Sequence, residues 1–144
     1  MLLNGCVSNS RQPAGLVQSP AYDIPARDMV GEVKRIVSSP PISLPVEDQQ
    51  DGMILTGWQP FRGEFHIARY WYERTRYHLT IVPDFNDPAK RSRIQVTDET
   101  EQRPDESGPN ESAKRWTPAP DLHRPERSAA LLQQIETQLG NLRR

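Results

Sequence analysis

Residues 72–82, YERTRYHLTIV, alternate between two kinds of side chain, and this alternation decides the fold class. The apolar and small members share one face of the predicted strand: Thr75, Tyr77, Leu79 and Ile81. The polar members share the other face: Arg74, Arg76, His78 and Thr80. This pattern is typical of an antiparallel sheet with one packed face and one solvated face. Residues 93–100, RIQVTDET, predict a neighbouring strand with Ile94 and Val96 directed inward.

Two amphipathic patterns predict helices on either side of these strands. The first has one apolar stripe, formed by Met29, Val30, Val33, Ile36 and Val37. Asp23 can cap this helix, Pro25 suits its first turn, and Pro40-Pro41 ends it. The second pattern spans about 124–142 and has a longer stripe, formed by Ala129, Leu131, Leu132, Ile135, Leu139 and Leu142. This stripe covers only about two heptads, so we expect it to pack on the sheet.

The segment between the first helix and residue 72 predicts a hairpin. Residues 42–46 and 53–58 have strand patterns, and Asp51-Gly52 is a turn signal between them. The polar residues 47–50 favour a loop longer than two residues, and residues 59–64, QPFRGE, predict a second turn. We therefore expect an α+β fold, in which a small antiparallel sheet of three or four strands packs against two helices.

Length and composition indicate one domain with irregular segments beside it. The chain has 144 residues and 14 prolines, and hydrophobic residues make up only 35%. Residues 7–21 have the composition of a flexible tether, and residues 103–121 that of an irregular linker inside the domain of residues 22–142. The 18 basic and 19 acidic residues nearly cancel, which argues against a polycationic nucleic-acid binder.

The N-terminal residues Leu2-Leu3-Asn4-Gly5-Cys6 resemble the lipobox of bacterial lipoproteins. In a lipobox an aliphatic residue stands three positions before the cysteine and a small residue directly before it. The resemblance implies that Cys6 is lipidated and becomes the first residue of the mature protein. Val7 is not the aspartate associated with inner-membrane retention, so the resemblance favours the outer membrane. The alternative is a free cysteine near a flexible end.

Aromatic and basic residues are interleaved between residues 58 and 77, and a lone tryptophan follows in the linker. Such mixtures can bind single-stranded nucleic acid, but here Glu64, Glu73, Asp84 and Asp98 offset the charge, which favours a protein partner. We take as candidate partner-binding residues Trp58, Phe61, Arg74, Arg76 and Trp116. The alternative is structural: the aromatic residues belong to the core, the arginines lie on the solvated sheet face, and Trp116 anchors the linker onto the domain.

The sequence predicts no catalytic, metal or cofactor site. His66, His78 and His123 have no cysteine or second histidine at ligand spacing. The carboxylates near residue 100 alternate between faces, so we expect salt bridges to the neighbouring strand rather than acid–base chemistry. The carboxylates are Asp98, Glu99 and Glu101, and their expected partners are Arg74, Arg76 and Arg93.

Three short segments together resemble a helix-grip domain of the BamC/NlpB family of outer-membrane lipoproteins. They are Thr56-Gly57-Trp58, Arg74-Thr75-Arg76-Tyr77 and Arg93-Ile94-Gln95-Val96, within a matching stretch of about 22–142. The resemblance implies a non-catalytic accessory lipoprotein on the periplasmic face of the membrane, which binds other envelope proteins in a multi-protein complex. A small-ligand carrier with a pocket between helix and sheet is the alternative.

Overall fold

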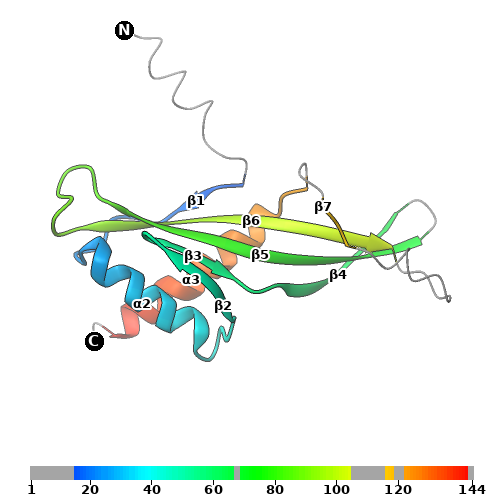
Figure 1. Cartoon of the computed structure of the whole chain (residues 1–144), viewed down its shortest axis with the longest axis horizontal. Coiled ribbons are helices and arrows are strands. Elements are labelled where there is room, and N and C mark those ends of the chain that lie inside the picture. The colour runs from blue at the N-terminus through cyan, green and yellow to red at the C-terminus, as the bar shows by residue number, and fades with distance from the viewer. Residues whose placement is uncertain (1–14, 67–68, 105–115, 119–121, 143–144) are drawn as a thin grey trace, which may run out of the picture.

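The computed structural model describes residues 15–66, 69–104, 116–118 and 122–142. The described chain is α+β, as predicted (Figure 1). The elements, in chain order, are β1 (Val17–Gln18), α2 (Ala26–Ser38), β2 (Val46–Gln50), β3 (Met53–Thr56), β4 (Gln59–His66), β5 (Arg69–Pro83), β6 (Ser92–Pro104), β7 (Thr117–Pro118) and α3 (Pro125–Leu142).

All strands join one antiparallel sheet, built around the long hairpin of β5 and β6. β3 and β4 pair with successive parts of the same edge of β5, and β2 pairs with β3. β1 and β7 pair with successive parts of the free edge of β6. The described part of the chain places seven strands in this sheet, so the expected three or four was too few.

The additional strands come from segments whose composition favours loops. Residues 47–50 belong to β2, because Asp51 and Gly52 close a two-residue turn with positive φ angles of 44° and 81°. The predicted turn at 59–64 was also wrong, since these residues belong to β4, which pairs with β5. A polar edge strand carries no apolar alternation, so periodicity alone does not find it.

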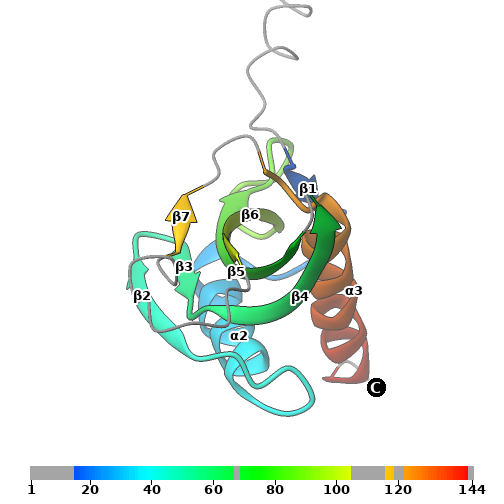
Figure 2. The ribbon, with the colours of Figure 1, turned by 90° about the vertical axis from the view of Figure 1, so that its right-hand side faces the viewer.

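Both helices pack against one face of the sheet, and their predicted stripes form the core with it. This inner face carries Tyr77, Leu79, Ile81, Ile94 and Val96, all buried. The helices contribute Met29, Val33, Ile36 and Val37 from α2 and Leu131, Leu132, Ile135 and Leu139 from α3. Figure 2 looks along the hairpin and shows a strongly curved sheet with α2 and α3 next to each other. The predicted packing of the closing helix on the sheet is confirmed.

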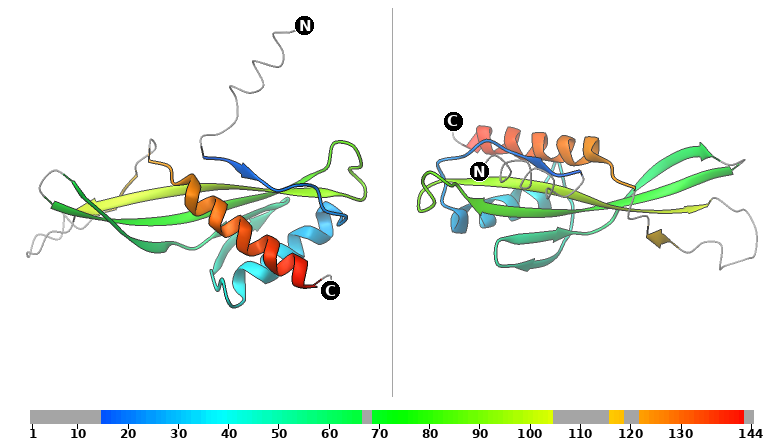
Figure 3. Two further views of the ribbon diagram at one scale, coloured as in Figure 1. Left: turned by 180° about the vertical axis from the view of Figure 1, so that it is seen from behind. Right: turned by 90° about the horizontal axis from the view of Figure 1, so that it is seen from above.

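The hairpin is longer than the helical layer. Figures 1 and 3 show the end that carries β4 and β7 extending past both helices. The opposite face of the sheet, called here the outer face, carries the polar alternation of β5 and β6. No described helix covers it.

Several predicted boundaries shift. Asp23 does not cap α2: its carboxylate pairs with Arg91 at 2.9 Å, and α2 has no side-chain cap. Residues 15–21 were expected in the tether, but Val17–Gln18 form β1 on the edge of β6. Likewise, the two ends of the predicted linker 103–121 contribute to β6 and β7. Residues 1–14, including Cys6, and residues 105–115 lie outside the described residues.

Candidate functional site

The outer face brings together four of the five candidate partner-binding residues. Trp58 lies between β3 and β4, directly after Gly57, where a Cβ atom would lie 2.6 Å from Pro45 Cγ. The Trp58 ring packs against two guanidinium groups of β5, that of Arg74 at 4.2 Å and that of Arg76 at 4.6 Å. These are cation–π distances, measured from the guanidinium carbon to the ring centroid.

The stacking continues towards the end of the hairpin. Trp116 lies 4.8 Å from the guanidinium of Arg74 and 5.1 Å from that of Arg103. The Arg103 guanidinium in turn lies 5.3 Å from the Tyr72 ring. Arginines and aromatic rings therefore alternate in one continuous row. We call this row the Trp–Arg ladder: Arg76, Trp58, Arg74, Trp116, Arg103 and Tyr72.

Glutamates of β6 neutralise the first part of the ladder. Arg74 donates a 2.8 Å hydrogen bond to Glu101, and Arg76 donates one of the same length to Glu99. His78 is also 2.9 Å from Glu99. The hydrogen bond from Arg76 is the main reason that the pKa of Glu99 is lowered, and the same bond raises the pKa of Arg76. The predicted cross-strand salt bridges of Glu99 and Glu101 are confirmed.

Asp98 and Arg93 do not join these cross-strand pairs. Arg93 pairs with the buried Asp84 at 3.1 Å. Asp98 faces inward, where its carboxylate accepts hydrogen bonds from the Thr100 hydroxyl at 2.9 Å and the Arg124 backbone N–H at 2.8 Å. Asp98 therefore secures the start of α3, and the expectation that it pairs with an arginine side chain was wrong. His123 Nδ1 lies 3.5 Å from the other Asp98 oxygen.

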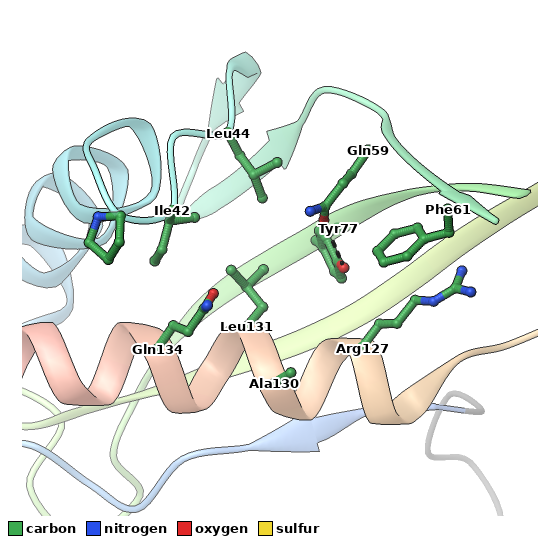
Figure 4. Close-up of a pocket in the computed structure, with 10 residues that line it drawn as sticks. Ile42, Leu44, Gln59, Phe61, Tyr77, Arg127, Ala130, Leu131 and Gln134 are labelled. Carbon is green, nitrogen blue, oxygen red and sulfur yellow. Dashed lines mark hydrogen bonds between the residues drawn. The ribbon is translucent and has the colours of Figure 1, made fainter.

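Phe61, the fifth candidate, lies on the inner face and takes no part in the ladder. It stands opposite Glu73 in the register of β4 and β5, and its ring lies 3.8 Å from the guanidinium of Arg127 on α3. Strand alternation explains the separation, because odd-numbered residues of β5 face inward and even-numbered ones outward. Phe61 borders a cleft between sheet and helix (Figure 4).

The cleft has a volume of about 230 Å³ and is mixed in character. Leu131 and Ile42 form its apolar part, and Tyr77 and Gln59 bring polar groups into it (Figure 4). The Tyr77 hydroxyl donates to the Gln59 side-chain oxygen over 3.4 Å, and burial raises the pKa of Tyr77 to about 12. The volume is below the roughly 300–1,000 Å³ usual for ligand sites.

A buried ion cluster closes the inner face beside the cleft. Glu73 on β5 binds two arginines of the α3 segment, Arg124 at 2.8 Å and Arg127 at 2.9 Å. Arg127 also donates to the Thr75 hydroxyl at 2.9 Å. Burial opposes the ionisation of Glu73, but the hydrogen bonds and charges of the two arginines outweigh it and lower its pKa. The cluster therefore holds the start of α3 against the sheet, and Arg127 already has protein partners.

Sequence reasoning missed Tyr72 and Arg103 as members of the ladder. The strand period could have found Tyr72, which precedes Arg74 by two residues and therefore shares its face. Arg103 was assigned to the linker, so its cross-strand position opposite Tyr72 was not foreseen. Within the described ranges, no group of three His, Cys, Asp or Glu residues could hold a metal ion.

Comparisons with known proteins do not assign the chain to a family. No protein-family model matches the sequence, and no curated protein matches it significantly. None of the described helices is long and apolar enough to cross a membrane.

Proposed function

We propose that this protein is a non-catalytic accessory lipoprotein, anchored in the outer membrane through Cys6, that binds another envelope protein with its Trp–Arg ladder. The observation that carries the binding role is the ladder itself. Trp, Tyr and Arg are the residue types that dominate the binding energy of protein interfaces. Here they are concentrated on a sheet face that no described helix covers.

The rigidity of the ladder supports a binding role. Each arginine in the ladder contacts at least one aromatic ring, and Arg74 and Arg76 are also tied to β6. Side chains that are already fixed lose little conformational entropy when a partner arrives. The ladder therefore offers broad amphipathic contact area in one ready conformation.

The resemblance to a lipobox supports the anchor. Acylation of Cys6 would place the domain at the periplasmic face of the membrane, with residues 7–16 of the sequence between the lipidated cysteine and β1. The resemblance of residues 22–142 to the BamC/NlpB family supports a multi-protein complex as the partner.

Two measurements on the precursor test the anchor and the binding role separately. We expect the precursor to incorporate labelled palmitate, and Cys6→Ser to abolish the label and release the protein from membranes. Purification from crosslinked membranes should then recover an envelope protein with the parent but not with Trp58→Ala, once the variant is shown to be folded. Labelling that persists in Cys6→Ser would disprove the anchor, and unchanged recovery with Trp58→Ala would disprove the role of the ladder.

The cleft favours a second candidate, a carrier for a small apolar ligand. Leu131 and Phe61 line it, so a planar apolar molecule would find suitable contacts. Against this, Arg127 and Tyr77 already bond within the protein, which leaves few groups to orient a ligand. Saturable binding of an apolar dye that Leu131→Trp abolishes would favour the carrier over the scaffold.

A further inference from the structure

The arginines at the two ends of the outer face differ in whether a carboxylate pairs with them. Arg74 and Arg76 each have a glutamate partner on β6. Arg62 and Arg103, nearer the end of the hairpin, have no carboxylate within ion-pair distance among the described residues, and each is stacked on a tyrosine instead. Among the described residues, the arginines of one half of the outer face therefore have acidic partners, and those of the other half have none.

The half without acidic partners forms a compact patch. In the strand register Arg62 stands opposite Tyr72, and Tyr72 stands opposite Arg103, so the three residues form a row across β4, β5 and β6. Tyr70 lies on the same face, 5.8 Å from the guanidinium of Arg62, and Trp116 covers Arg103. We call these five residues the distal patch. Tyr70 and Tyr72 are 49% and 36% exposed, so the patch offers aromatic surface as well as charge.

Arg103 is held between two aromatic rings. Its guanidinium lies against two rings, those of Tyr72 and Trp116. Its Nε is buried and has no hydrogen-bond partner among the described residues. Because Nε itself is buried, a carboxylate would have to approach the outer nitrogens of this guanidinium, where charge-assisted bonds are about twice as strong as neutral ones.

We propose that the distal patch binds an acidic segment of the partner protein, with its carboxylates on Arg62 and Arg103 and its apolar side chains on the two tyrosines. This inference rests on the proposed function. It adds the chemical class of the partner segment and the part of the outer face that selects it. Complementary charge at such a site selects the partner and speeds its association.

The rest of the outer face argues for a protein segment over a nucleic acid or an anionic membrane. Glu99 and the half-exposed Glu47 lie beyond Arg74, next to Arg76. A continuous polyanion that spans the outer face would meet these carboxylates, and the whole chain has a net charge of −1. Binding of nucleic acid depends on several phosphate contacts at once. A peptide can confine its acidic residues to the distal patch and present other groups to the glutamates.

Titration of the full-length chain with defined probes tests the proposal. The probe is a fluorescein-labelled peptide of alternating glutamate and phenylalanine, and its glutamine counterpart is the matched control. We expect the acidic peptide to bind at least about tenfold more tightly than the control, and less tightly as salt rises. Arg103→Gln and Arg62→Gln should each raise its Kd about tenfold, whereas Arg103→Lys should recover part of the loss. Arg35→Gln, which removes a charge from α2, should leave the Kd unchanged.

The outcomes separate this proposal from the function on which it rests. Equal affinity for the two peptides, or unchanged affinity in both Arg103→Gln and Arg62→Gln, would overturn the proposal. So would tighter binding of a thymidine oligonucleotide or of phosphatidylglycerol vesicles than of the acidic peptide. Arg62 is exposed and has no ion pair with another described residue, so Arg62→Gln keeps the test valid even if Arg103→Gln unfolds. If Trp58→Ala abolishes recovery of the partner but one of these overturning results is also found, the ladder still binds the partner and only the proposal of an acidic segment is rejected.

Discussion

Replacing single arginines of the ladder tests whether its ring and carboxylate contacts hold these side chains in place. Arg74 contacts two tryptophan rings and Glu101, whereas Arg76 contacts one tryptophan ring and Glu99. A cation–π contact contributes about 0.5–1 kcal/mol where it is exposed, and an ion pair with partial solvent access about as much. Arg74→Gln should therefore lower the free energy of unfolding by about 1.5–3 kcal/mol, and Arg76→Gln by about 1–2 kcal/mol.

Arg35 supplies the matched control for this series. It pairs with Glu32 on the surface of α2 and both side chains are well exposed, so Arg35→Gln should cost only about 0.3–0.5 kcal/mol. Urea denaturation followed by tryptophan fluorescence and far-ultraviolet circular dichroism gives the three values on one scale. The loss of unfolding free energy should be largest for Arg74→Gln, intermediate for Arg76→Gln and smallest for Arg35→Gln. A loss for Arg74→Gln no larger than for Arg35→Gln would show that the rings and carboxylates of the ladder do not act on the arginines.

Three further predictions concern the core, the ion cluster and the anchor. Leu132 is buried between α3 and the sheet, so Leu132→Ala should lower the free energy of unfolding by about 2–5 kcal/mol and lower the midpoint temperature of the single thermal transition. The control Gln133→Ala, at an exposed position of the same helix, should change the free energy of unfolding by no more than about 0.5 kcal/mol. A Leu132→Ala variant that melts like the parent would mean that α3 is not part of the folded unit. Because the pKa of Glu73 is lowered from its ordinary value of 4.5, its ion pairs stabilise the fold above that pH and the contribution is lost as the pH falls through the folded-state pKa. The stability deficit of Glu73→Gln should accordingly be largest near neutral pH and shrink in acid, and a deficit that grows on acidification would contradict the assignment. Cys6→Ser should move the protein from the membrane to the soluble fraction on flotation gradients, and continued flotation would exclude Cys6 as the anchor.

The sequence predicted those helices and strands in which buried residues recur at the helical or strand period. The stripes of α2 and α3 and the alternation of β5 and β6 correspond to real faces, because those residues form the core. The shift of β2 to Val46–Gln50 could not be predicted in the same way, since its polar residues follow the turn at Asp51-Gly52 rather than a hydrophobic pattern. β4 was missed because Pro60 and Gly63 favour a turn, whereas its pairing with β5 prevails in the fold.

The candidate site was predicted only in part, for a related reason. Arg74, Arg76, Trp58 and Trp116 were selected by residue type, and the structure brings them together. Their order in the ladder depends on cross-strand register and on the return of the chain at β7, neither of which is local in the sequence. Phe61 shows the limit of residue type alone, because the register of β4 directs its side chain to the opposite face.

Site-specific photocrosslinking in intact membranes can show whether the partner protein contacts the Trp–Arg ladder. A photoreactive phenylalanine analogue would be incorporated in turn at Tyr72 in the ladder, at Phe85 in the loop between β5 and β6, and at Gln133 on the exposed side of α3. All three side chains reach solvent, so they differ mainly in the surface on which they lie. We expect one discrete adduct with an envelope protein from the position of Tyr72, lost when Trp58→Ala is added, and no such adduct from the other two positions. Adducts from Phe85 or Gln133 in the absence of one from Tyr72 would place the partner on another surface and contradict a binding role for the ladder.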